Sequence, residues 1–260
     1  MRALWTGALN FGLINIPVRL YSATQDHGLS FDMLHKKDLS PIRFARICKS
    51  DGKEVPYKDI VKGYEYQKGD YVVLVEEDFK QATVKKTKTI DILDFTFEKE
   101  IDPLYYEKPY YLEPDKGASK AYVLLREALK KSKKVGVAKF VLHNREHIAV
   151  IKPHDHLIIL NQLRYQNEIK NTSNLHIPEK EVASSKEITM AIKLIDQLTS
   201  HFHLEDYHDT YTEELKAIID DKLKGKKPKH AKAKEAKITP VKDIMAMLKE
   251  SLEEHQRKSA

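Results

Sequence analysis

The segment at residues 143–147 reads HNREH, which matches the H-x-x-E-H pattern of zinc-dependent proteases. That chemistry needs both histidines on one face of a helix, with the glutamate beside them. The flanking runs, KFVL and IAVI, are instead typical of strands, and Asn144-Arg145 suits a turn. We therefore predict a β-hairpin here, in which the histidines need not converge on a metal. A zinc hydrolase built on His143, Glu146 and His147 is kept as an alternative.

Other residues with chemical potential carry weaker signals. Histidines and acids gather in two further segments, but such residues are more often exposed loop side chains than metal ligands. These are His154, Asp155 and His156 in the first segment, and His201, His203, Glu205 and His208 in the second. The single cysteine, Cys48, is best interpreted as a small, partly buried thiol, because nothing nearby in sequence activates it.

The motifs of the common enzyme classes are missing from the chain. There is no G-x-x-x-x-G-K, no G-x-G-x-x-G and no G-x-S-x-G. The sequence therefore offers no support for an enzyme, and we expect no metal and no cofactor. One cysteine cannot form an internal disulfide, which favours a reducing compartment and a cytoplasmic location. No apolar run approaches the length of about 20 residues that crosses a bilayer.

Charge is sorted along the chain rather than mixed. The formal net charge is +6 over 260 residues. Residues 1–221 hold 33 basic and 34 acidic residues, whereas residues 222–260 hold 12 and 5. Within the body, residues 36–53 and 126–145 are basic, at +4 and +6, and residues 91–115 and 205–221 are each at −6. A body of this kind can present a positive face to a polyanion such as nucleic acid.

Strands dominate the first two thirds of the chain. The opening, MRALWTGALNFGLINIPVRLYSAT, is not an export signal, because Thr6, Asn10, Asn15 and two glycines interrupt its apolar run. We predict two strands around a bend, with Pro17 at a strand start or edge. Further strands are predicted at 71–75, where a buried strand is expected, and at 89–97, 105–112, 137–142, 147–152 and 157–165.

Helices alternate with charged connections elsewhere in the chain. The spacing of apolar residues predicts helices over 76–88, 117–133, 186–199 and 211–223, with Gly136 closing the second of these. Residues 225–240, GKKPKHAKAKEAKITP, are rich in lysine and predict a solvated linker. A last amphipathic helix follows from Val241. The predicted organisation is therefore a core at 1–185, a helical arm at 186–224, a linker at 225–240 and a terminal helix at 241–260.

Several short motifs, in order and at matching spacing over roughly residues 1–223, resemble the bacterial Ku family. They include Trp5-Thr6-Gly7, the run Asn15-Ile16-Pro17-Val18, and Glu54-Val55-Pro56-Tyr57. The segments DIVKGYEY at 59–66, EIDP at 100–103 and KAYVLLREAL at 120–129 continue the match. One departure concerns Cys48, because many bacterial Ku proteins carry a pair of cysteines in this region and the second is absent here.

The resemblance implies a mixed α+β fold, with a Ku-type β-barrel core, a DNA-encircling bridge and a helical C-terminal arm. It implies a non-enzymatic homodimer that binds double-stranded DNA ends without sequence preference, in the cytoplasm and associated with the nucleoid. It also implies recruitment of an ATP-dependent DNA ligase for non-homologous end joining. A ring that slides onto any end should contact phosphates through lysines and arginines, which makes binding salt-dependent.

The resemblance and the charge pattern together predict three groups of site residues. The predicted DNA-binding residues are Lys36, Lys37, Arg43, Arg46, Lys53, Arg126, Lys130, Lys131, Lys133, Lys134 and Arg145. The predicted dimer interface is Ile188, Ile192, Ile195, Leu198, Tyr211 and Leu215. The predicted contact for a ligase or second protein is Val241, Ile244, Met245 and Leu248. A general DNA-compacting protein is the second alternative, and Arg19 is left either facing the bore or capping the barrel surface.

Overall fold

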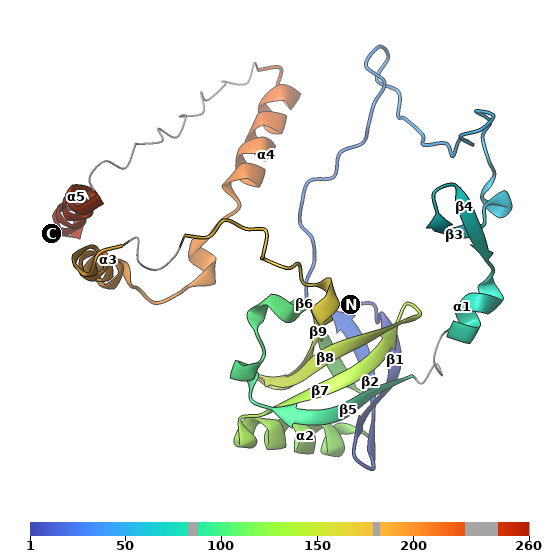
Figure 1. Ribbon diagram of the computed structural model, residues 1–260, viewed down its shortest axis with the longest axis horizontal. Helices are drawn as coiled ribbons and strands as arrows, with labels where there is room; N and C mark the ends of the chain where they lie inside the picture. The colour runs from blue at the N-terminus through green and yellow to red at the C-terminus, as the bar shows by residue number, and fades with distance from the viewer. Residues whose placement is uncertain (83–87, 179–182, 227–243, 260) are drawn as a thin grey trace. The chain divides into compact units, whose positions relative to one another are not determined.

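The computed structural model describes residues 1–82, 88–178, 183–226 and 244–259. The chain divides into two compact units, Met1–Asn171 and Thr172–Ala260, and each is described by itself. Among the described residues, all strands lie in the first unit, and the second unit contains α3, α4 and α5 (Figure 1). The mixed α+β fold class predicted from the sequence is confirmed.

A closed seven-stranded barrel forms the centre of the first unit (Figure 1). Its strands are β1 (Trp5–Phe11), β2 (Ile14–Ser22), β5 (Thr89–Thr96), β6 (Tyr106–Pro114), β7 (Val135–Leu142), β8 (Arg145–His154) and β9 (Leu157–Leu163). They follow the order β1-β2-β6-β9-β8-β7-β5 around the barrel. All neighbours are antiparallel except β1 and β5, which run parallel and close the barrel. Closure removes the exposed sheet edges that would otherwise template aggregation.

The opening of the chain folds as the hairpin that the sequence predicts. β1 and β2 pair from Trp5–Leu20 to Phe11–Ile14, and Gly12 takes a positive φ of 57° in the turn between them. Pro17 lies inside β2 rather than at its start. Its carbonyl accepts a bond from the Asp115 N–H, so its missing donor faces the β6 side, where pairing begins only at Val18. The proline therefore breaks no ladder bond.

Gly7 marks the point where the parallel pair begins. A Cβ atom added at Gly7 would lie 2.2 Å from the Lys88 carbonyl oxygen and 2.2 Å from the Trp5 ring. The neighbouring Ala8 N–H donates to that same Lys88 carbonyl at 2.9 Å. A side chain at Gly7 would therefore push apart the two strands that close the barrel.

Helix α2 (Ser119–Ser132) packs on the barrel and completes its core (Figure 1). Its buried face consists of Tyr122, Leu125 and Leu129, at helical spacing. The Tyr122 hydroxyl donates to the Leu112 carbonyl at 2.6 Å and accepts from the Ile158 N–H at 2.7 Å. One tyrosine thus ties the helix to β6 and β9. The barrel interior that α2 covers is apolar. Its fully buried residues include Leu9, Ile16, Val18, Leu20, Ile90, Ile151 and Leu160.

A long segment leaves the barrel after β2 and returns at β5. It contains a 3-10 helix at Tyr57–Asp59, strands β3 (Lys62–Gln67) and β4 (Asp70–Leu74), and helix α1 (Glu76–Ala82). β3 and β4 form a separate two-stranded sheet. The buried strand predicted at 71–75 is thus a strand, but the prediction of burial is wrong. Val72 and Val73 are about half exposed, because no third element covers this sheet within the described part of the chain.

Short 3-10 helices at Glu98–Glu100 and Pro103–Tyr105 join β5 to β6, and another at Gln166–Glu168 follows β9. The second unit begins with α3 (Ser185–Leu198), whose first turn is closed by a capping box between Ser184 and Glu187. A 3-10 helix at Leu204–Asp206 precedes α4 (Thr210–Leu223), and α5 (Ile244–Ser259) ends the described chain. Residues 227–243, which contain most of the predicted linker and Val241, lie outside the described residues.

Candidate nucleic-acid interface

The C-terminal end of α2 carries the densest group of exposed cations predicted to bind DNA. Lys130 and Lys131 lie in the last turn of the helix, and Lys133 and Lys134 follow it. All four side chains are exposed. Cations at this end of a helix are favoured by the negative end of the helix dipole. We call Lys130, Lys131, Lys133 and Lys134 the α2 lysine cluster.

The backbone at Lys133 ends the helix and turns the chain into β7. Lys133 adopts the left-handed conformation, with φ 56° and ψ 29°. The prediction that Gly136 closes this helix is therefore wrong. Gly136 lies instead in β7, where an added Cβ atom would come within 3.2 Å of the Ile92 side chain. Gly136 therefore allows close packing against β5, and Lys133 adopts the left-handed conformation that ends the helix.

An exposed aromatic ring enlarges this basic surface. The Nζ atoms of Lys134 and Lys99 lie 5.6 Å and 5.7 Å from the centroid of the Phe97 ring. Both distances are within the range of cation–π attraction. Phe97 and Lys99 were not among the predicted DNA-binding residues, since they belong to the acidic stretch at 91–115. A phenylalanine close to a lysine in an otherwise acidic run was the feature of the sequence that could have indicated this site.

The acids of that stretch are partly neutralised by partners. Glu98 accepts from the Lys152 ammonium group at 2.5 Å, and Glu100 accepts from the Thr96 hydroxyl. On the neighbouring hairpin, Lys139 pairs with Glu146 at 3.0 Å. This carboxylate holds the pKa of Lys139 above its ordinary value, first through its hydrogen bond and then through its charge. Of these contacts, the Lys152–Glu98 ion pair lies beside Phe97 and reduces the repulsion of a polyanion near the α2 lysine cluster.

Arg126 occupies a different environment from the lysines that follow it. Its guanidinium donates to the carbonyl of His156 and pairs with Glu127 at 2.8 Å. Its side chain is only 18% exposed. The contact joins α2 to the turn between β8 and β9. Arg126 therefore serves the fold first, and it offers less to a phosphate than the other predicted residues.

The β7–β8 hairpin separates Arg145 from the α2 lysine cluster. The register pairs Leu142 with Arg145, so the two-residue turn is His143-Asn144, one residue earlier than predicted. Both turn residues have positive φ, at 50° and 65°, as this turn type requires. Arg145 is exposed at the hairpin tip, while Lys133 and Lys134 lie at the opposite end of β7. The eight residues of that strand span about 25 Å.

The hairpin geometry also bears on the zinc alternative. His147 pairs with Phe140 in the strands and stacks near its ring, with centroids 5.5 Å apart, while His143 lies in the turn. Within the described residues, no three histidine, cysteine or acidic side chains are grouped so that they could hold a metal ion. The predicted hairpin is confirmed, and its geometry gives no support to a helical zinc motif.

The first basic segment lies outside the barrel. Asp51-Gly52 forms a tight turn in this segment, in which the Cys48 N–H donates to the Lys53 carbonyl and Gly52 has a φ of 71°. Lys36 and Lys37 are exposed. The three other predicted cations have local partners. Arg43 pairs with Glu54 at 3.9 Å, Lys53 pairs with Asp51 at 3.7 Å, and Arg46 lies 5.2 Å from the Tyr57 ring centroid. Such exposed pairs are weak, so these cations stay available to phosphates.

Cys48 is partly buried beside this turn, as the sequence suggests. Its Sγ lies 3.1 Å from the Ser50 hydroxyl oxygen. Hydrogen bonds from Ser50, first from its side chain and then from its backbone, lower the pKa of the thiol below its ordinary value. Arg19, which was left open, pairs with Asp115 and, at 3.9 Å, with Glu113 of β6. The bond to Asp115 raises the pKa of Arg19, and the pair caps the barrel surface.

Exposed aromatic residues on the β3–β4 sheet were not predicted as functional. Tyr64, Tyr66 and Tyr71 are each more than half exposed. Lys62 on the same sheet places its Nζ 4.7 Å from the centroid of the Phe79 ring. Basic and aromatic side chains that alternate on an exposed hairpin can contact a nucleic-acid backbone and its sugars. Burial was predicted for 71–75, so the exposure of Tyr71 was not expected.

The predicted protein-contact residues lie on the helices of the second unit. Ile188, Ile192, Ile195 and Leu198 on α3 are between 44% and 61% exposed. On α4, Tyr211 is exposed and Leu215 is half-buried. On α5, Ile244 is exposed, whereas Met245 and Leu248 are half-buried. Within the described part of the chain, no helix is both long enough and apolar enough to cross a membrane.

Comparison with known proteins identifies the class to which this barrel and its basic elements belong. The family model of the Ku70/Ku80 beta-barrel domain matches residues 10–190. The chain belongs to the Ku β-barrel family. The fold expectation that rested on the sequence motifs is thereby confirmed.

Bacterial proteins are among its curated relatives. The protein named "Non-homologous end joining protein Ku" of Opitutus terrae is 44% identical, over 97% of this chain and 91% of the relative. Proteins of the same name from Bacillus subtilis and Coxiella burnetii are each 36% identical, over 99% and 98% of this chain and 83% and 96% of theirs. Among solved structures, the SPOC domain of human PHD-finger protein 3 matches at 11% identity and a TM-score of 0.31. This match covers 65% of this chain and all of that one.

Proposed function

We propose that this protein binds the ends of double-stranded DNA, without sequence preference, as a step in non-homologous end joining. The observation that carries the proposal is the near full-length similarity to bacterial proteins named for that process. The chain covers at least 83% of each of these relatives, so the likeness extends beyond the barrel.

The charge distribution supports a backbone-directed mode of binding. The α2 lysine cluster and the first basic segment present exposed cations, which suit phosphates rather than base edges. Neutralising phosphates releases counterions, so the affinity should fall steeply as salt rises. This mode requires no catalytic group and no cofactor on the chain.

We further propose that two copies form a homodimer through the helical arm. Ile188, Ile192, Ile195 and Leu198 form an apolar stripe whose side chains are between 44% and 61% exposed. A second copy of α3 and α4 offers a matching apolar surface with twofold symmetry. A closed homodimer would encircle DNA. A closed ring can be threaded only at a free end, which accounts for binding to ends without sequence preference.

The last part of the proposal concerns a protein partner. We propose that α5 recruits an ATP-dependent DNA ligase, which joins the ends that the dimer holds. An amphipathic helix commonly binds by laying its apolar face into a groove of its partner. Ile244, Met245 and Leu248 supply such a face within the described residues.

A binding assay on linear and circular DNA tests the central proposal. Fragments with free blunt ends should bind far more tightly than nicked circles of equal length, at two salt concentrations. Equal affinity for both forms would overturn end binding. It would favour the alternative of a general DNA-compacting protein, which the +7 net charge of residues 222–260 otherwise supports.

A further inference from the structure

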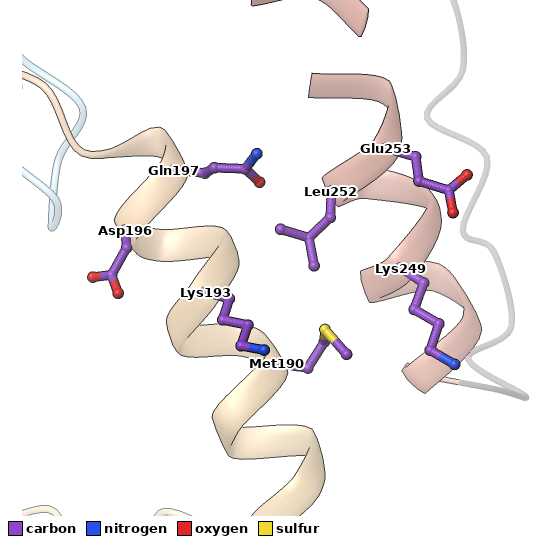
Figure 2. A pocket seen from close by; sticks show the side chains of 7 residues that line it. All are labelled: Met190, Lys193, Asp196, Gln197, Lys249, Leu252 and Glu253. Carbon is purple, nitrogen blue, oxygen red and sulfur yellow. The ribbon is translucent and has the colours of Figure 1, made fainter. Parts of the chain in front are cut away.

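Helix α5 contacts α3 within the second unit of the chain. A groove between the two helices is lined by Met190, Lys193, Asp196 and Gln197 from α3, and by Lys249, Leu252 and Glu253 from α5. Figure 2 shows the side chains of Met190, Gln197 and Leu252 directed into the space between the helices. Both helices also carry charges of both signs along this groove. The contact therefore combines apolar residues at its centre with charged residues along its edges.

Only one face of α3 takes part in this contact. At 100° per residue, Met190, Lys193 and Gln197 share a face that lies opposite the one formed by Ile188, Ile192 and Ile195. The latter three residues belong to the proposed dimer stripe and are 44% to 61% exposed. The contact with α5 thus leaves the dimer stripe open. A chain can hold α5 on α3 and dimerise at the same time.

The face of α5 that meets α3 is the apolar one. Met245, Leu248 and Leu252 follow an i, i+3, i+7 pattern and are half-buried. Met245 lines a second groove together with Met190 of α3. By contrast, Ile244 and Met247 turn outward and are 47% and 40% exposed. The contact with α3 therefore partly covers Met245 and Leu248, two of the α5 residues that are proposed to bind a protein partner.

We propose that α5 docks in cis on α3 and thereby hides its own partner-binding face. The contact acts as an autoinhibitory clasp, which rests on the proposed role of α5 in recruiting a ligase. The ligase must capture the undocked form, so its apparent dissociation constant is the intrinsic value divided by the undocked fraction. Three half-buried apolar side chains give a contact weak enough to open.

A substitution on α3 tests the clasp without touching α5. Met190→Asp places a charge in the apolar part of the groove and should release the helix. If about a tenth of α5 is undocked in the native chain, release tightens ligase binding about tenfold. Met190→Leu should keep the native affinity, because it preserves an apolar residue of similar volume. Ala217→Asp on α4 controls for the added charge.

A disulfide trap reports on docking independently of any ligase. In a Cys48→Ser background, Met190→Cys with Leu252→Cys should cross-link within one chain on mild oxidation. The pair Ile192→Cys with Leu252→Cys should not, since residue 192 is on the opposite face of α3. Oxidation of the trapped protein should abolish capture by the end-joining ligase, and reduction should restore it.

The two experiments separate this inference from the function on which it rests. Absence of the cross-link, or a cross-link only between two chains, would overturn docking in cis even if the ligase binds well. A cross-link in cis with unchanged ligase affinity in Met190→Asp would overturn the inhibitory role. If the cross-link forms but no variant captures the ligase, recruitment by α5 fails, and the hidden face loses its proposed purpose.

Discussion

At the scale of single residues, cations within one basic segment have opposite relations to the fold. The α2 lysine cluster is exposed at a helix end, whereas Arg126 is largely covered and joined to Glu127 and the His156 carbonyl. Basic residues close together in the chain can therefore either be available to bind DNA or stabilise the barrel. Burial and hydrogen-bond partners distinguish the two, and neither is visible in the charge pattern.

The α2 lysine cluster should set part of the salt dependence of DNA binding. Replacing Lys131, Lys133 and Lys134 together by glutamine should weaken binding to all end sequences alike. The slope of log affinity against log salt should fall by about 0.9 for each phosphate that the variant no longer neutralises. Fluorescence anisotropy with labelled duplex ends at several salt concentrations measures this slope. An unchanged slope would remove these lysines from the interface.

Arg126→Gln is the matched variant for that experiment. Because Arg126 ties α2 to the β8–β9 turn, its replacement should lower the melting temperature by about 3 °C, for a decrease in stability of about 1 kcal/mol. The salt slope should stay as in the native protein. Thermal denaturation followed by circular dichroism gives the first quantity. A native melting temperature with a reduced slope would instead return Arg126 to the DNA interface.

At the scale of elements, helix ends decide how well the arm presents its apolar stripes. Asp209 caps α4, since its carboxylate accepts from the Thr212 N–H at 3.0 Å and from the Thr212 hydroxyl. These bonds, the side-chain bond first, hold the pKa of Asp209 below its ordinary value. A carboxyl group with a lowered pKa stabilises the fold above its unfolded pKa. That contribution disappears as pH falls through its folded pKa.

Removal of this cap should therefore weaken both α4 and the proposed dimer. Asp209→Ala should lower the helix content at neutral pH and raise the dimer dissociation constant, because Tyr211 and Leu215 follow on the same helix. Asp209→Asn should keep the cap at neutral pH but lose its dependence on acid below about pH 4. Circular dichroism and analytical ultracentrifugation across pH measure both effects. Native dimerisation in Asp209→Ala would place the interface away from α4.

Most elements were predictable because their signals are local. The helical stripes of α2, α3 and α4 and the alternation of β5 and β7 follow from periods of 3.6 and 2 within short windows. The end of α2 was predicted to within one residue, but the residue that closes it was not, because nothing in the sequence marks a lysine in left-handed conformation. The exposure of β4 was also missed, since a run of valines indicates burial unless the lack of a covering element is known.

At the scale of the whole molecule, the C-terminal segment should be separable from the dimer. Deleting residues 225–260 should leave the dimer intact, because Ile188, Ile192 and Ile195 lie opposite the face of α3 that meets α5. The truncated protein should stimulate the ligase less and retain DNA less well, since it lacks α5 and the net charge of +5 that residues 225–260 carry. Light scattering and ligation assays measure these quantities. A truncated chain that runs as a monomer would contradict the separation.

The sequence by itself determined the periodic elements, the sorting of charge and the motifs that resemble Ku, because these depend on residues close together in the chain. Only the tertiary structure decided which cations are free, which apolar faces are open and how the barrel closes. Closure joins residues 8–10 to residues 89–91, across a segment that no local pattern could bridge. The covering of α5 by α3 likewise depends on two helices more than forty residues apart. Whether a residue is buried depends on the element that packs against it as well as on its own type. Elements distant in sequence come into contact only when the chain folds.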